Sequence, residues 1–127
     1  MNKKNKYVIQ WLTLSMYVII LMVLVGGITR LTHSGLSITQ WKPVTGVLPP
    51  QSKEEWSKTF EHYKSYPEFK KINYSMTLKE YKFIYYWEYL HRMLGRFIGL
   101  LFIIPFTIFY IKDYINKKYI RNFIILF

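Results

Sequence analysis

The feature that most constrains this chain is the uncharged run YVIQWLTLSMYVIILMVLVGGI, from Tyr7 to Ile28. The hydrocarbon core of a bilayer is about 30 Å thick, and a helix needs roughly 20 apolar residues to cross it. The run therefore predicts a first transmembrane helix over residues 7–28. A cleaved signal peptide is the alternative, but the run is longer than a usual signal sequence and no small-residue cleavage site ends it.

A second long helix is predicted from Thr77 to Ile111. Thr77 and Glu80 have the spacing of a capping box, in which each side chain accepts from the backbone N–H of the other residue. At 1.5 Å per residue this helix would be roughly 50 Å long, more than a bilayer requires, so its first two turns should stand outside the lipid. Pro105 is expected to kink it, which neighbouring helices can accommodate.

The ends of the chain suggest a topology. The basic segment 112–121 is followed by NFIILF at 122–127, in which we predict the start of a third span, so the chain is expected to be the N-terminal piece of a longer protein. Lysines in residues 1–6 and basic residues in 112–121 place both segments in the cytoplasm by the positive-inside rule. The loop at 29–76 should then lie on the outer, periplasmic side.

The outer loop carries its own helix signal. Ser52 and Glu55 form a second capping box, and Trp56, Phe60 and Tyr63 follow at helical spacing. This pattern predicts an amphipathic helix over about 53–66 that Pro67 stops, with an aromatic stripe packed on the membrane face or on other loops. The expected fold class is an all-α integral membrane protein.

Composition narrows the chemistry. The formal charge is +11, and many of the basic residues lie beside the apolar runs, which favours contact with membrane lipids over nucleic acid. The chain has no cysteine, which excludes disulfides, thiolate zinc sites, iron–sulfur ligation and covalent haem attachment. Any metal must therefore be bound by His, Met, Tyr or carboxylate side chains.

Charged residues gather at the start of the second apolar run, in WEYLHRMLGR at 87–96. Glu88, His91 and Arg92 are helical neighbours, and Arg96 follows one turn later. Gly95 opens a G-x-x-x-G that would let another helix or a flat ligand approach. A purely structural interpretation is open: the arginines could bind lipid headgroups, and Glu88 could do no more than neutralise Arg92.

His91 is too short to reach the headgroups well and is not needed for charge balance. A neutral imidazole in a helical membrane bundle can ligate haem, and nearby arginines suit haem propionates, although a satisfied interfacial histidine remains the alternative. His33 could reach the same site or be a solvated loop residue, and no role is assigned to His62. Gly26 and Gly27 indicate a turn or close packing, because no nucleotide-binding glycine motif is present.

Two blocks, TRLTHSGLS at 29–37 and EYLHRMLGR at 88–96, carry a family resemblance. With the sequence between them they resemble the start of haem A synthase, in the cysteine-free form found in proteobacteria and mitochondria. The similarity covers nearly the whole chain. It implies the N-terminal part of a four-helix haem-binding half, in a protein that oxidises a methyl group of haem O to the formyl group of haem A for cytochrome c oxidase.

The resemblance also implies residue roles. His91 would be an axial ligand of haem iron, with a second histidine expected beyond residue 127, and Arg92 and Arg96 would lie near the propionates. Glu88 would be catalytic, in proton handling or in stabilising a cationic intermediate. The implied cofactors are haem b, haem O as substrate, and iron.

The implied setting is the bacterial inner membrane, or the mitochondrial inner membrane in a eukaryote. Haem O synthase and oxidase assembly factors are candidate partners, and a homo-oligomer is an open alternative. The fragment alone is expected to be inactive. Two other functions remain open: a non-catalytic haem-binding or oxidase-assembly subunit, and a two-span structural subunit whose charges contact only lipid.

Overall fold

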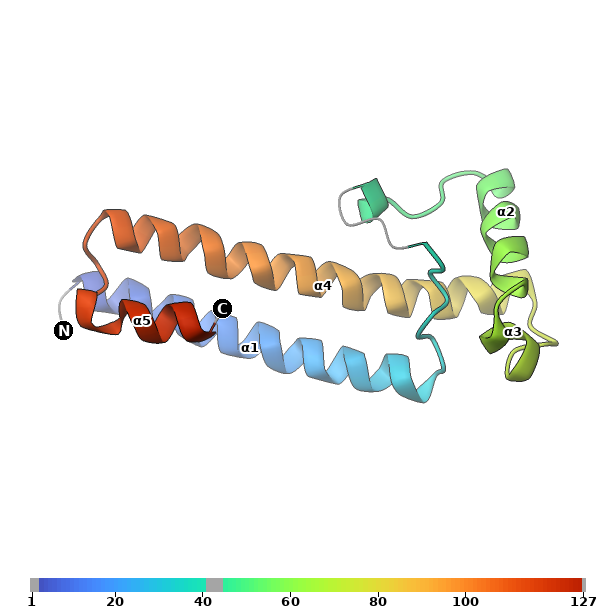
Figure 1. The fold of residues 1–127 in the computed structure, drawn as a ribbon, viewed down its shortest axis with the longest axis horizontal. Helices are drawn as coiled ribbons and strands as arrows, with labels where there is room; N and C mark the ends of the chain where they lie inside the picture. Colours follow the sequence, from blue (N-terminus) through green and yellow to red (C-terminus); the bar gives the residue numbers. More distant parts are fainter. Residues whose placement is uncertain (1–2, 41–44, 127) are drawn as a thin grey trace. The chain divides into compact units, whose positions relative to one another are not determined.

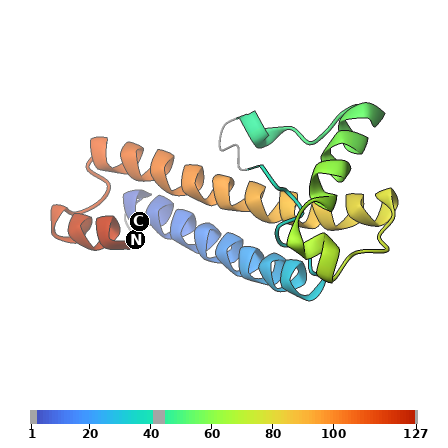
Figure 2. The same cartoon turned by 45° about the vertical axis from the view of Figure 1, so that its right-hand side comes forward.

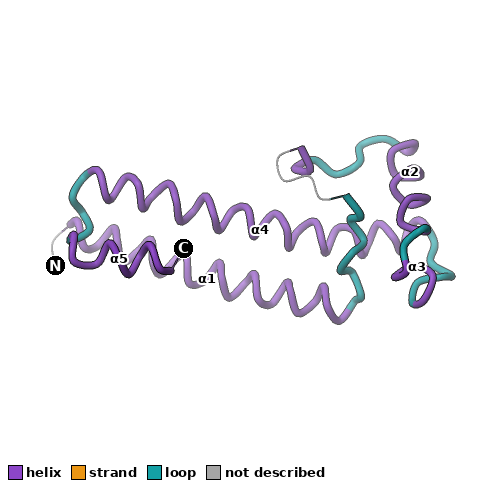
Figure 3. Tube along the Cα trace, in the orientation of Figure 1, coloured by secondary structure: helices purple, strands orange, loops and turns teal. Residues whose placement is uncertain are grey.

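The computed structural model describes residues 3–40 and 45–126, so the parts of the predicted termini and outer loop at 1–2, 41–44 and 127 lie outside the described residues. Within these ranges every regular element is helical, which confirms the all-α fold class (Figures 1 and 3). The elements are α1 (Lys3–Leu31), the short 3-10 turn η1 (Thr45–Val47), α2 (Lys53–Lys64), α3 (Pro67–Lys71), α4 (Leu78–Ile111) and α5 (Lys117–Leu126).

Two of these helices, α1 and α4, are long and apolar enough to cross a membrane. Helix α1 contains the predicted span at 7–28 and continues to Lys3 and Leu31; it has no proline, and the Gly26–Gly27 pair does not interrupt it. Many large apolar side chains on both helices are exposed, such as Val23 at 68% and Ile104 at 52%. Faces of this kind are suited to lipid or to further helices rather than to water.

The chain forms two compact units, which are described separately. The first unit comprises residues 1–23 and 94–127, and the second comprises residues 24–93. Helices α1 and α4 each contribute to both units.

Trp11 is the centre of the first unit. Its indole is 6% exposed and packs against the rings of Phe102, Phe109 and Phe123, with centroid separations of 5.2, 5.5 and 5.9 Å. Phe123 belongs to α5, so this contact holds α5 against the first half of α1 (Figure 2).

The same tryptophan explains how α4 continues through Pro105. Proline has no N–H, so the carbonyl four residues earlier, that of Leu101, loses its helical partner. The indole Nε1 of Trp11 donates a hydrogen bond of 2.8 Å to this carbonyl. Helix α1 therefore satisfies the polar group that Pro105 leaves open, which a membrane interior requires.

We predict that Trp11→Phe destabilises the protein by about 1–3 kcal/mol, because it leaves the Leu101 carbonyl without a donor. The loss should shrink in a Pro105→Ala background, where the new backbone N–H can bond to Leu101 itself. The measurement is a double-mutant cycle: denaturation midpoints in detergent are compared for the wild type, the two single variants and the double variant. Equal losses in both backgrounds would show that the hydrogen bond contributes nothing.

The core of the second unit is aromatic. Trp56, Phe60 and Tyr63 of α2 are buried, as their helical spacing predicts, and they pack on Tyr81 and Tyr85 in the first turns of α4, with Ile84 completing the buried cluster. The stripe was expected to meet the membrane face or other loops. The loop residues Ile38 and Met76 do pack against the cluster, but its main partner is the first part of α4.

Local sequence sets the ends of these helices. The Ser52–Glu55 capping box is formed at the start of α2. At the start of α4, the Glu80 carboxylate accepts the Thr77 backbone N–H at 2.7 Å, and the Thr77 hydroxyl accepts the Glu80 N–H at 3.4 Å. Pro67 does not simply end α2, which stops at Lys64; it occupies the first turn of α3, where its missing N–H is tolerated.

Tyr63 fixes the connection that leads into α4. Its hydroxyl accepts a 2.8 Å hydrogen bond from the Asn73 side chain, and its ring is fully buried. Burial raises the pKa of Tyr63, more than the Asn73 hydrogen bond lowers it. The hydroxyl is therefore held as a neutral acceptor in the aromatic core.

Helix α5, at the position of the predicted third span, begins earlier than expected. Residues 112–121 were predicted as a loop and 122–127 as the start of a span, but α5 begins at Lys117. The reason is a cap: the Asn116 side-chain oxygen accepts the Lys118 backbone N–H at 3.0 Å. Asparagine is among the preferred residues at this position, and the basic composition of the segment concealed the signal.

Candidate functional site

The chain leaves α1 through a compact turn in the second unit. The Thr29 hydroxyl donates to the Gly26 carbonyl at 2.7 Å, and the Thr29 carbonyl accepts the Ser34 N–H at 2.9 Å. Ser34 is fully buried and its hydroxyl contacts that of Thr32. His33 adopts a positive φ of 50° and is exposed, in keeping with its interpretation as a solvated loop residue.

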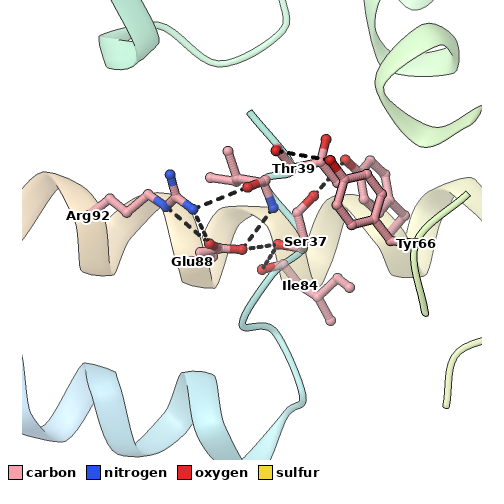
Figure 4. Close-up of polar contacts among 8 residues, drawn as sticks. Ser37, Thr39, Tyr66, Ile84, Glu88 and Arg92 are labelled. Atoms are coloured by element: carbon pink, nitrogen blue, oxygen red, sulfur yellow. Dashed lines mark hydrogen bonds and ion pairs between the residues drawn. The ribbon is translucent and has the colours of Figure 1, made fainter. Parts of the chain in front are cut away.

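After this turn, residues 37 and 38 lie against the carboxylate of Glu88 in α4 (Figure 4). One carboxylate oxygen, Oε2, accepts the Ser37 hydroxyl and the Ile38 backbone N–H, each at 2.8 Å. The other, Oε1, accepts Nε and Nη2 of Arg92 at 3.0 and 2.6 Å. We call Ser37, Ile38, Glu88 and Arg92 the Glu88 clamp.

The clamp fits a charged carboxylate. Glu88 is 7% exposed and receives four donors, two on each oxygen. A protonated carboxyl would place its own hydrogen against one of these donors, whereas a carboxylate accepts all of them. Such charge-assisted hydrogen bonds are among the stronger ones in proteins.

Arg92 and Tyr81 complete the attachment of the loop. Arg92 Nη2 also donates to the Ile38 carbonyl at 3.1 Å, so both backbone groups of Ile38 are bound to α4. The Tyr81 hydroxyl donates to the Ser37 carbonyl at 3.1 Å. The predicted pairing of Glu88 with Arg92 is present, and it is part of a larger network that joins the two family blocks.

Sequence reasoning missed Ser37 and Gly26. Ser37 is fully buried and supplies a donor from the first block to the acid in the second. The only local signal is a small polar residue between Leu36 and Ile38.

His91 lies next to this network but outside it. Its side chain is half-buried. Neither of its ring nitrogens takes part in the hydrogen bonds that the structure describes for the Glu88 clamp. The imidazole lies against Gly26 of α1: a Cβ built on this glycine would be 3.0 Å from Nε2. A Cβ at the adjacent Gly27 would have open space around it.

The remaining candidates lie elsewhere. Arg96 belongs to the first unit, whereas the residues of the clamp belong to the second. Of the G-x-x-x-G pair, a Cβ on Gly95 would touch the Met22 side chain at 3.4 Å, whereas one on Gly99 would meet nothing within 4 Å. No group of three or more His, Asp or Glu side chains with metal-binding geometry occurs in the part of the chain that the structure describes.

His62, to which no role was assigned, has a structural contact. Its Nδ1 lies 2.7 Å from the Thr39 hydroxyl, and its ring is 5.4 Å from that of Tyr66. The Tyr66 hydroxyl donates to the Thr39 carbonyl at 3.4 Å. These exposed contacts connect the loop to α2 just after the clamp.

We predict that Ser37→Ala lowers the free energy of unfolding by about 1.5–3 kcal/mol, because it removes a buried donor to a charged acceptor. The Ile38 amide should also exchange its hydrogen faster. Thermal denaturation and hydrogen exchange in detergent measure the two effects.

Ser57→Ala is the matched control for this variant. Ser57 is an exposed serine of α2, and surface substitutions of this kind change stability by less than about 0.5 kcal/mol. The same small effect for Ser37→Ala would contradict the clamp.

Comparisons with known proteins give a consistent result. The family model described as cytochrome oxidase assembly protein (COX15-CtaA) matches residues 9–127. The chain is 52% identical over 126 residues to haem A synthase of Flavobacterium psychrophilum, covering 98% of this chain and 37% of that protein. It is 51% identical over 122 residues to haem A synthase of Rickettsia felis, covering 96% and 36%.

A third relative, haem A synthase of Ehrlichia canis, is 54% identical over 116 residues, covering 91% of this chain and 33% of that protein. The chain thus spans about a third of the length of the curated relatives it matches. No solved structure matches it.

Proposed function

Since the chain belongs to the haem A synthase (COX15-CtaA) family of cytochrome oxidase assembly proteins, we propose that the whole protein containing these residues oxidises haem O to haem A. The proposal covers the reaction, the substrate and the roles of individual residues. It rests on family membership together with one observation, the position of His91.

The proposal assigns His91 as the axial ligand, because it is the histidine at the position of the family's E-Y-x-H-R block. The imidazole comes from a helix long enough to span a membrane, is half-buried, and is not engaged by the neighbouring clamp. One imidazole from this segment is enough for the proposal, because the second axial ligand of a haem can come from another helix. When bound, the haem supplies redox-active iron and, as haem O, the methyl group that is oxidised.

Arg92 and Arg96 are proposed to bind the propionates. Guanidinium groups pair with carboxylates through two parallel hydrogen bonds. Arg92 already contacts Glu88 and the Ile38 carbonyl, and its side chain is 24% exposed, which leaves one edge accessible. Arg96 contributes as a second basic residue of the same helix.

Glu88 is proposed to act as a fixed negative charge near the group being oxidised. The four donors around it hold the carboxylate in one position and orientation, which suits this electrostatic role. A preorganised charge of this kind lowers the energy of positive charge that develops nearby.

The orientation follows from the distribution of basic residues. We propose a cytoplasmic N-terminus, an outer loop at 29–76, and a cytoplasmic connection after α4. Residues 1–127 contain no cysteine, so once any cysteine beyond residue 127 is replaced, single cysteines at Ser57 and Lys118 can be labelled with a membrane-impermeant maleimide in intact cells. The proposed orientation predicts labelling of Ser57→Cys but not of Lys118→Cys. The opposite pattern would show that the orientation is reversed.

We predict that His91→Ala in the intact protein reduces bound haem and abolishes haem A formation, because the iron loses its imidazole ligand. His91→Gly should recover part of the haem binding when free imidazole is added. The Soret band of the purified protein and chromatographic analysis of extracted haems are the measurements.

His62→Ala is the control, because His62 is an exposed histidine of α2. Unchanged haem content and haem A formation in His91→Ala would contradict the assignment. A wild-type protein that binds haem O but forms no haem A would instead favour a non-catalytic haem-binding or assembly role.

A further inference from the structure

We propose that a groove between α1 and α4 in the first unit binds an anionic phospholipid of the cytoplasmic leaflet. The groove has a volume of about 410 Å³ and is lined by residues in the ranges 7–14 and 101–114. This site has no part in the haem chemistry proposed above. It uses only the orientation inferred from the basic residues, which places the start of α1 and the end of α4 at the cytoplasmic surface.

One part of the groove is apolar. The residues that line it include Leu14 of α1 and Leu101, Pro105 and Ile108 of α4. Leu14 and Ile108 are 51% and 43% exposed. Trp11 also lines this part, and its hydrogen bond to the Leu101 carbonyl holds the two helices together here. An exposed apolar surface on helices that can span a membrane is suited to the acyl chain of a lipid.

The polar residues of the groove lie together at its other end. They are Tyr7 and Gln10 of α1 and Lys112 and Tyr114, which follow α4. Leu101 and Lys112 are eleven residues apart in the sequence. This separation corresponds to about 16 Å along a helix, and one leaflet of a bilayer core that is about 30 Å thick measures roughly 15 Å. The groove therefore has the depth of one leaflet, with its polar end at the membrane surface.

The turn after α4 fixes this polar end. Asp113 has a positive φ of 51°, and its N–H donates to the Tyr110 carbonyl at 3.2 Å. The next residue, Tyr114, donates its N–H to the Phe109 carbonyl at 2.8 Å. The rings of Tyr114 and Phe109 are stacked, with centroids 5.6 Å apart. The reversal of the chain thus returns the Tyr114 ring to the groove that Lys112 also lines.

The chemistry of the polar end matches a phosphodiester. Lys112 supplies an ammonium group, and the Nζ of Lys4 lies 5.3 Å from the ring centre of Tyr114. Tyrosine hydroxyls and the Gln10 amide can donate hydrogen bonds. Phosphate oxygens accept such bonds, and those from an ammonium are strengthened by its charge.

The surrounding sequence has the same sign of charge. Residues 1–23 and 112–127 contain seven Lys and Arg but one acidic residue, Asp113, which is exposed in the turn. A second copy of this face would bring like charges together, so the charge disfavours a copy of the chain as the occupant. Anionic lipids give the cytoplasmic leaflet a negative surface potential, which attracts basic segments beside the membrane. The charge balance therefore favours an anionic phospholipid.

The first experiment measures lipid selectivity. The intact protein in detergent is titrated separately with dioleoyl phosphatidylglycerol and dioleoyl phosphatidylcholine, and bound lipid is counted by native mass spectrometry. We expect tighter binding of phosphatidylglycerol. Lys112→Gln should weaken this binding about fivefold, the effect of one basic residue at an anionic membrane surface. Lys112→Arg should keep the preference, because it keeps the charge.

Lys118→Gln is the matched control. It removes the same charge from an exposed residue of α5 that does not line the groove. An equal loss for Lys118→Gln and Lys112→Gln would overturn the proposal, because general attraction of charge and not the groove would then select the lipid. Equal binding of the two lipids by the wild type would overturn it as well.

The second experiment fills the apolar part of the groove. Leu14→Trp places a larger side chain there and should reduce the amount of phosphatidylglycerol that the protein retains. Leu21→Trp is its control, because Leu21 is 48% exposed on the same helix but does not line the groove. We expect Leu21→Trp to bind phosphatidylglycerol as the wild type does.

Two results with these tryptophan variants would contradict the lipid site. One is unchanged binding of phosphatidylglycerol by Leu14→Trp, which would show that the lipid binds elsewhere. The other is a Leu14→Trp protein that fails to fold while Leu21→Trp folds normally, which would show that protein and not lipid covers the groove.

Discussion

The second unit depends on one buried carboxylate. Glu88 binds a hydroxyl, a backbone amide and a guanidinium, and these donors come from the loop after α1 and from α4 itself. Removing one partner of a buried ion pair costs roughly 3–5 kcal/mol, and somewhat less here because the Arg92 side chain is 24% exposed. Without this anchor, residues 37 and 38 would keep only the hydrogen bonds that Tyr81 and Arg92 donate to their carbonyls.

The same physical requirement appears in the first unit in a simpler form. Pro105 leaves the Leu101 carbonyl without its helical donor, and the Trp11 indole replaces that donor from α1. In both units a polar group on an apolar helix accepts hydrogen bonds from specific donors on another segment: Ser37 and Ile38 for Glu88, and Trp11 for the Leu101 carbonyl. A membrane interior enforces this rule, because water is not present to compensate.

The features that the sequence predicted correctly are the local ones. Length, apolar runs and the capping boxes at Ser52 and Thr77 were enough to predict α1, α2 and α4, because each signal is local. The Glu88–Arg92 pair was visible for the same reason, at a spacing of one helical turn. The start of α5 was placed too late because its cap at Asn116 lay within a segment read as basic loop.

Contacts between distant segments left no comparable pattern. The burial of Ser37 on Glu88 depends on how the loop folds back, and nothing in the spacing of apolar residues encodes it. The contact of Gly26 with His91 was equally hidden, since a glycine pair in an apolar helix indicates close packing without naming the partner. The aromatic stripe of α2 was predicted as a stripe, but its position on Tyr81 and Tyr85 required the structure.

The central claim is that His91, beside the Glu88 clamp, is an axial ligand of haem iron. The most direct measurement is the reduction potential of the haem in the intact protein, compared between wild type and His91→Met. A methionine ligand raises the potential of haem iron relative to histidine, so the account predicts a shift to higher potential with a matching change in the ligand spectrum. An unchanged potential and spectrum in a fully haem-loaded His91→Met protein would contradict it.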